Sequence, residues 1–178
     1  MDFIVENALN NAPEHDFENM SQANIKVIGV GGAGNNMVGW LYKKGIKGAE
    51  IIATNTDHQH LNITGADRKF LIGKDCTRGL GCGGFPSRGA EAAQESMTVV
   101  KDALKTSDMV FVCAGMGGGT GTGASPVVAQ VAKDTGAIVI GTVTMPFNIE
   151  RARCDKAEFG LQQLRQVADT VIVIDNNR

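Results

Sequence analysis

The chain has 178 residues, 43% of them hydrophobic and 20% charged, which predicts one globular domain with a substantial core. Its formal net charge of −2 lacks the basic excess typical of nucleic-acid binding, and no apolar run approaches the roughly 20 residues that span a bilayer. The four cysteines form no C-x-x-C pair, so we expect no zinc site and no disulfide framework, and we assign no side chain as a direct metal ligand. These features predict a cytoplasmic protein with no nucleic-acid partner and no membrane insertion.

Residues 1–23 differ in composition from the rest of the chain. They are acidic and rich in asparagine, include a few apolar residues such as Phe3 and Leu9, and contain no lysine or arginine. This composition excludes a secretory signal peptide. A short docking helix and a disordered tail both fit it, so we treat 1–23 as an N-terminal extension of a domain at 24–178.

From residue 24 onward, short apolar runs alternate with helix-like stretches. Many of the apolar runs are β-branched, as in strands that are covered on both faces. The predicted strands are 25–30, 50–54, 69–72, 109–113, 138–143 and 170–174. The predicted helices are 35–44, 89–105, 124–134 and 153–167. This alternation predicts an α/β fold, a doubly wound, mostly parallel Rossmann-like sheet of about six strands with helices on both faces.

A glycine-rich turn follows the first predicted strand. Residues 29–34 satisfy G-x-G-x-x-G, and Asp57 lies about twenty residues after the motif's end, which is the fingerprint of dinucleotide binding. An NAD-binding Rossmann oxidoreductase domain is therefore one candidate. A Walker-type phosphate loop is excluded, because the G-K at 73–74 is followed by aspartate instead of a magnesium-binding hydroxyl.

A second glycine loop reads A-G-M-G-G-G-T-G-T-G at 114–123, between a predicted strand and a predicted helix. Backbone N–H groups at such a junction converge on an anion, so we interpret it as a phosphate cradle. A third loop, G-L-G-C-G-G, occupies 79–84. In a doubly wound sheet ligands bind at the carboxyl ends of the strands, so we expect all three loops at that edge.

From Ile25 to Arg178 the chain resembles the Tubulin/FtsZ family, in particular its prokaryotic cell-division GTPases. It shares with them, in order, the motifs V-G-G-A-G-N-N, N-T-D, R-G-L-G-C-G-G-F-P, G-G-G-T-G-T-G and T-M-P-F-N-I-E. The resemblance implies GTP or GDP as the bound nucleotide, with Mg²⁺ accompanying GTP. It also implies that the activating carboxylates come from a second domain of a neighbouring subunit, so this chain contains no complete catalytic set.

The resemblance further implies a role for each loop. The first loop would wrap the α- and β-phosphates, the 117–122 loop with its Thr120 hydroxyl would hold the β- and γ-phosphates, and loop 82–84 would sense the γ-phosphate. Glu150 would bind the ribose, an arginine just after it would contact the nucleotide, and Asn176 would read the guanine edge. The full implied set is Gly31, Gly32, Ala33, Gly34, Asn35, Asn36, Asn55, Asp57, Cys82, Gly83, Gly84, Gly117, Gly118, Gly119, Thr120, Gly121, Thr122, Glu150, Arg153 and Asn176.

The chain departs from the family pattern at three places. Family members have a glycine after the ribose glutamate, whereas Arg151 stands here and one residue is missing, so Arg153 is our choice for the nucleotide arginine and Arg151 the alternate. Asp175 replaces a proline. The family continues into a long helix and a C-terminal activation domain, so we expect this chain to be truncated.

The function implied by the resemblance is that of a GTP-binding, GTP-hydrolysing subunit of a tubulin-like cytokinetic filament, in the cytoplasm at the division site. Its partners would be further copies, joined head to tail, and division-ring proteins. The fragment itself would bind GTP or GDP with little hydrolysis. Two side chains are expected to be structural only: Trp40, packed on the sheet, and Thr144, a strand former.

Overall fold

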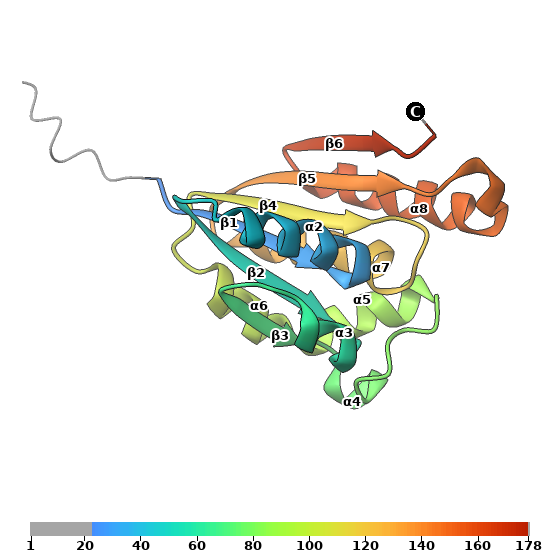
Figure 1. Cartoon of the computed structure of the whole chain (residues 1–178), viewed down its shortest axis with the longest axis horizontal. Helices are drawn as coiled ribbons and strands as arrows, with labels where there is room; N and C mark the ends of the chain where they lie inside the picture. The colour runs from blue at the N-terminus through green and yellow to red at the C-terminus, as the bar shows by residue number, and fades with distance from the viewer. Residues whose placement is uncertain (1–22, 178) are drawn as a thin grey trace, which may run out of the picture.

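One six-stranded parallel sheet organises the chain, and this computed structural model describes residues 23–177 of it. All but the last residue of the predicted extension 1–23 lie outside the described residues. The strand order is β3-β2-β1-β4-β5-β6, and the strand ends carrying the arrowheads meet at one edge (Figure 1). The strands are β1 (Ile25–Val30), β2 (Ala49–Asn55), β3 (Arg68–Leu71), β4 (Met109–Gly115), β5 (Ile138–Met145) and β6 (Thr170–Asp175). Every pair is parallel, which confirms the predicted fold class.

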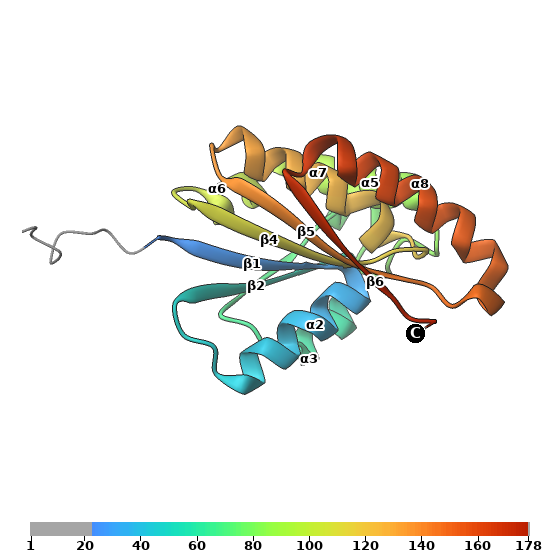
Figure 2. The same ribbon diagram turned by 90° about the horizontal axis from the view of Figure 1, so that it is seen from above.

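Helices cover both faces of the sheet (Figure 2). One face carries α2 (Gly31–Lys44) and α3 (His58–Ile63). The other carries α5 (Pro86–Glu95), α6 (Met97–Leu104), α7 (Thr120–Asp134) and α8 (Arg151–Val167). Two single turns, α4 (Lys74–Thr77) and η2 (Asn148–Glu150), complete the described elements.

Two apolar clusters fill the space between the sheet and these helices, because successive strand residues point to opposite faces. On β1, Ile28 joins the larger cluster with Val128 of α7, whereas Val27 joins the smaller cluster with Val38 of α2. The parallel sheet is therefore covered on both sides, as its apolar strands predict.

Helix boundaries differ from the prediction more than strand boundaries do. The expected helix 89–105 is two helices that meet at Ser96, which is buried and non-helical (φ −101°, ψ 13°). Its hydroxyl accepts a hydrogen bond from the Gly73 N–H (3.0 Å), so the side chain serves a distant loop at the point where the helix breaks. The prediction for Trp40 was wrong: 59% of this residue is exposed, and Lys44 lies over its ring.

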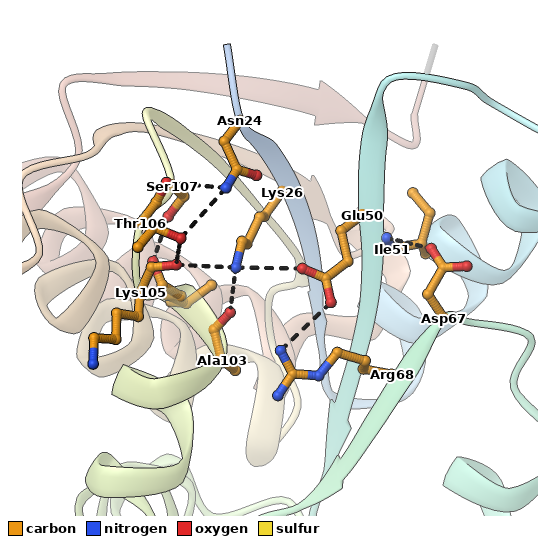
Figure 3. A network of polar contacts seen from close by, with 11 residues as sticks. Asn24, Lys26, Glu50, Ile51, Asp67, Arg68, Ala103, Lys105, Thr106 and Ser107 are labelled. Carbon is orange, nitrogen blue, oxygen red and sulfur yellow. Dashed lines mark hydrogen bonds and ion pairs between the residues drawn. The ribbon is translucent and has the colours of Figure 1, made fainter. Parts of the chain in front are cut away.

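A buried lysine, Lys26, links β1 to the end of α6 and to β2 near the amino ends of the strands (Figure 3). Lys26 Nζ donates to the main-chain oxygens of Ala103 (2.8 Å) and Lys105 (3.2 Å) and pairs with Glu50 (3.3 Å), which also contacts Arg68. The two oxygens belong to the C-terminal end of α6, where the helix dipole favours a cation. The charge is thus compensated on every side, as a buried ammonium requires.

Within the described part of the chain, no helix has both the length and the apolar character needed to cross a membrane.

Candidate functional site

A cavity of about 300 Å³ opens at the carboxyl ends of the central strands. This is the edge at which parallel α/β sheets bind ligands, and the volume is at the lower end of the range for small-molecule sites. Nine of the predicted site residues form part of its wall: Gly32, Ala33, Gly118, Gly119, Thr120, Gly121, Glu150, Arg153 and Asn176.

Two helix N-termini begin at this cavity. The first residue of α2 is Gly31 and that of α7 is Thr120, four residues earlier in each case than the sequence predicted. The N-cap residues, Val30 and Gly119, make no side-chain capping bond, and neither first turn contains an acidic residue. The N–H groups of both first turns therefore remain available to a ligand, and both helix dipoles favour a negative one.

The two glycine loops approach each other too closely for side chains. Gly31 has φ +74°, and a Cβ placed on it would lie 2.7 Å from the Gly121 nitrogen. A Cβ on Gly121 would in turn overlap the main-chain oxygen of Gly115. The glycines at these positions thus allow the backbones of the two loops to close one side of the cavity.

Glu150 and Arg153 form the charged part of the wall. Glu150 Oε2 accepts a hydrogen bond from Arg153 Nη1 (2.8 Å), and its Oε1 accepts one from the Phe147 N–H (3.1 Å). Both candidate arginines are exposed, and the structure places Arg153, but not Arg151, on the wall. Among residues 23–177, Arg153 supplies the one cationic side chain of the wall, and no lysine lines the cavity.

Sequence reasoning missed part of the wall. Thr144 was expected to be a strand former only, yet the end of β5 brings it into the cavity. Its position at the carboxyl end of a central strand was the signal that could have identified it. Other wall residues outside the predicted set are Val30, Gly115, Met116, Met145 and Pro146.

The remaining predicted residues lie behind or beside the wall. Thr122 Oγ1 accepts a hydrogen bond from the Gly117 N–H (2.9 Å), so this hydroxyl shapes the loop. Asp57 caps α3 by accepting from the His60 N–H (3.0 Å). The residues away from the wall are Gly31, Gly34, Asn35, Asn36, Asn55, Asp57, Cys82, Gly83, Gly84, Gly117 and Thr122.

Asn35 is the residue of this set whose buried side chain lacks hydrogen bonds within residues 23–177. It is 1% exposed, and neither its side-chain nitrogen nor its side-chain oxygen has a hydrogen-bond partner among the described residues. A Cβ on Gly29 would lie 2.9 Å from Asn35 Oδ1, so the amide is held against β1, under the first loop. The structure does not bring this side chain to the cavity wall.

The shifted pKa values lie outside the cavity. The pKa of Glu95 is lowered by hydrogen bonds from the backbone N–H groups of Asp75 and Cys76, at the start of α4. Burial and then Glu95 raise the pKa of the Cys76 thiol to about 11, and burial raises that of Cys113 to about 12. Across residues 23–177, no group of three or more His, Cys, Asp or Glu side chains is placed to hold a metal ion.

The fold and the site together define a class of protein: a doubly wound α/β domain, as in nucleotide-binding folds, with glycine-rich loops at the carboxyl edge of its sheet. Comparison with known proteins then gives the family, because the model of the Tubulin/FtsZ family, GTPase domain, matches residues 24–178. The chain belongs to this family.

Individual relatives agree with this assignment. The chain is 56% identical over 161 residues to cell division protein FtsZ 2 of Methanocaldococcus jannaschii, covering 90% of this chain and 42% of that protein. A solved FtsZ dimer from M. jannaschii superposes with a TM-score of 0.87 at 47% identity, over 98% of this chain and 49% of that one. CetZ2 from Haloferax volcanii, solved as a GTPγS-bound protofilament, gives a TM-score of 0.79 at 29% identity, over 86% and 49%.

The chain thus spans less than half the length of this curated relative. The comparisons do not favour the alternative of an NAD-binding oxidoreductase domain, since the family model and these relatives are of the Tubulin/FtsZ type.

Proposed function

We propose that the cavity binds GTP or GDP, with the phosphates at the two helix N-termini and the sugar and base towards Glu150 and Asn176. The observation that carries the proposal is that α2 and α7 both begin at one cavity without a side-chain cap. Backbone N–H groups and helix dipoles then provide the charge compensation that a lysine provides elsewhere. The GTPγS-bound protofilament of CetZ2 supports this choice of ligand.

Each polar group on the wall has a place in this proposal. The Thr120 hydroxyl donates to the β- or γ-phosphate, Arg153 compensates phosphate charge, and Glu150 accepts from the ribose hydroxyls. Mg²⁺ enters with the triphosphate, since phosphate oxygens and water are the ligands that it prefers at such sites.

We infer that the whole protein is a GTP-hydrolysing subunit of a cell-division filament, cytoplasmic at the division site, in which copies join head to tail and meet division-ring proteins. The FtsZ dimer and the CetZ2 protofilament among the similar structures support self-association. Hydrolysis of a phosphoanhydride needs an oriented water as well as charge stabilisation. In the proposed arrangement the activating carboxylates of a neighbouring subunit's second domain orient that water, so this chain alone hydrolyses GTP about 10²–10⁴-fold more slowly than a complete filament.

Thermal denaturation of the 178-residue chain tests the ligand. GDP at a hundred times its dissociation constant adds about 2.7 kcal/mol of stability, which shifts Tm by about 5–10 °C. ATP and NAD are the controls, and a shift with NAD alone would support the oxidoreductase alternative. Phosphate release measured on the same chain tests the second claim, and turnover equal to that of a full-length relative would refute it.

A further inference from the structure

Three side chains from three separate loops form a closed hydrogen-bonded ring beside the cavity. The oxygens Thr56 Oγ1 and Thr120 Oγ1 lie 2.7 Å apart, and Cys82 Sγ lies 3.4 Å from each of them. Thr56 directly follows β2, Cys82 lies between α4 and α5, and Thr120 begins α7. Of the three, only Thr120 lines the cavity.

Thr56 holds the loop around Cys82 through its main chain as well. Its carbonyl oxygen accepts from the Gly81 N–H (3.1 Å), and the residue is fully buried. The two glycine-rich loops also touch directly, because a Cβ on Gly119 would lie 2.7 Å from the Cβ of Cys82. The ring therefore joins loop 79–84 to the 117–123 loop at the point where their backbones meet.

The ring fixes how the three hydrogens can be used. Each group carries one hydrogen, and the positions of the heavy atoms allow Thr120 to donate to Cys82 and Cys82 to donate to Thr56. If Thr56 donates to Thr120, the ring closes with each of the three groups donating once and accepting once. A phosphate oxygen near Thr120 can accept the hydrogen of the Thr120 hydroxyl, while Thr56 still donates its own hydrogen to Thr120 Oγ1.

We propose that Thr56 is a positioning residue, which turns the Thr120 hydroxyl towards a terminal phosphate and holds loop 79–84 beside it. This rests on the proposed function only in naming the phosphate. When the Thr120 hydroxyl turns to donate to a phosphate, it no longer donates to Cys82, so the thiol loses one of its two hydrogen bonds. The charge of the ligand is thereby coupled to loop 79–84.

The test compares Thr56→Val with Thr54→Val. Both threonines are fully buried at the end of β2, and Thr54 donates to the main-chain oxygen of Gly29 (2.8 Å), outside the ring, so it controls for the loss of a buried hydroxyl. Thr56→Ser keeps the ring hydroxyl and is the rescue variant.

The first readout needs no nucleotide. Alkylation of Cys82 is followed by mass spectrometry of the tryptic peptide 79–88, in which it is the sole cysteine. Loss of one hydrogen bond makes labelling about threefold to tenfold faster in Thr56→Val, and leaves Thr54→Val and Thr56→Ser at the parent rate. Equal rates in the two valine variants would overturn the proposal, whether or not guanine nucleotides bind.

The second readout is the ratio of the dissociation constants for GDP and a non-hydrolysable GTP analogue. We expect this ratio to change by about threefold to tenfold in Thr56→Val, through weaker binding of the triphosphate, and to stay at the parent value in the other two variants. A parent chain that binds neither nucleotide would refute the proposed function, and the labelling rates would still decide on the ring. Binding of both nucleotides with an unchanged ratio in Thr56→Val would refute the positioning role.

Discussion

Gly31 offers a direct test of the close approach between the two glycine loops. In Gly31→Ala, the alanine has to adopt φ +74°. Its Cβ then lies 2.7 Å from the Gly121 nitrogen, a backbone atom that cannot move without shifting its loop. The left-handed conformation costs about 1–2 kcal/mol and the overlap about 1–3 kcal/mol. Alanine also restricts the unfolded chain, which offsets about 0.4–1 kcal/mol. The expected loss in the free energy of unfolding is therefore about 1–5 kcal/mol.

Gly45→Ala is the matched control, because Gly45 ends the same helix with φ +68° and has no atom within 4 Å of its ideal Cβ position. It carries the conformational cost alone, about 1 kcal/mol after the same offset. Urea denaturation gives both losses, and titration with GDP gives the affinities. We expect at least a tenfold weaker affinity in Gly31→Ala, equivalent to about 1.4 kcal/mol, and an unchanged one in Gly45→Ala. Equal losses in unfolding free energy for the two variants would refute the close approach of the loops.

Three further perturbations probe other parts of the molecule. Lys26→Met leaves the buried main-chain oxygen of Ala103 without its donor and removes the ion pair with Glu50, so urea denaturation should show a loss of about 2–4 kcal/mol with nucleotide affinity unchanged. The lowered pKa of Glu95, caused above all by the Asp75 N–H, gives stability at neutral pH that is lost as the pH falls below its ordinary value of 4.5. The free energy of unfolding of Glu95→Gln, measured by denaturation at several pH values, should therefore fall less steeply than that of the parent chain as the pH drops below 4.5. Arg153→Ala should weaken GDP binding about tenfold in a titration, and Arg151→Ala should leave it unchanged.

The strands could be predicted from the sequence because their signal is local. An apolar, β-branched run predicts a strand wherever both faces of the sheet are covered, and the observed strand ends lie within two residues of the predicted ones. The break at Ser96 could not be predicted in this way. It depends on a hydrogen bond with Gly73, a residue 23 positions away, and no local pattern contains that partner.

The site could be predicted at the level of loops but not of single side chains. Which glycines face the cavity depends on how neighbouring loops meet, and β1 pairs with β4 in a register that sets Gly29 beside Cys113. In that register a Cβ on Gly34 would overlap the Cys113 oxygen, so this glycine serves packing, whereas Gly32 of the same motif lines the cavity. The motif G-x-G-x-x-G requires the packing glycine at position 34, but it accepts any residue at position 32 and so does not show that Gly32 lines a cavity.

The helix ends at the two edges of the sheet differ: those of α2 and α7 at the carboxyl edge are left uncapped, and the end of α6 at the amino edge is satisfied by a side chain. A capping side chain would stabilise α2 or α7 by about 1 kcal/mol, but it would occupy the N–H groups that a phosphate needs. Both helices begin uncapped at the carboxyl edge, so the domain forgoes that stabilisation where the ligand is proposed to bind. At the amino edge, where no such competition exists, Lys26 satisfies the end of α6 and pairs with Glu50 (Figure 3). A bound phosphate then supplies the missing caps, so the ligand and the fold stabilise each other through the same N–H groups.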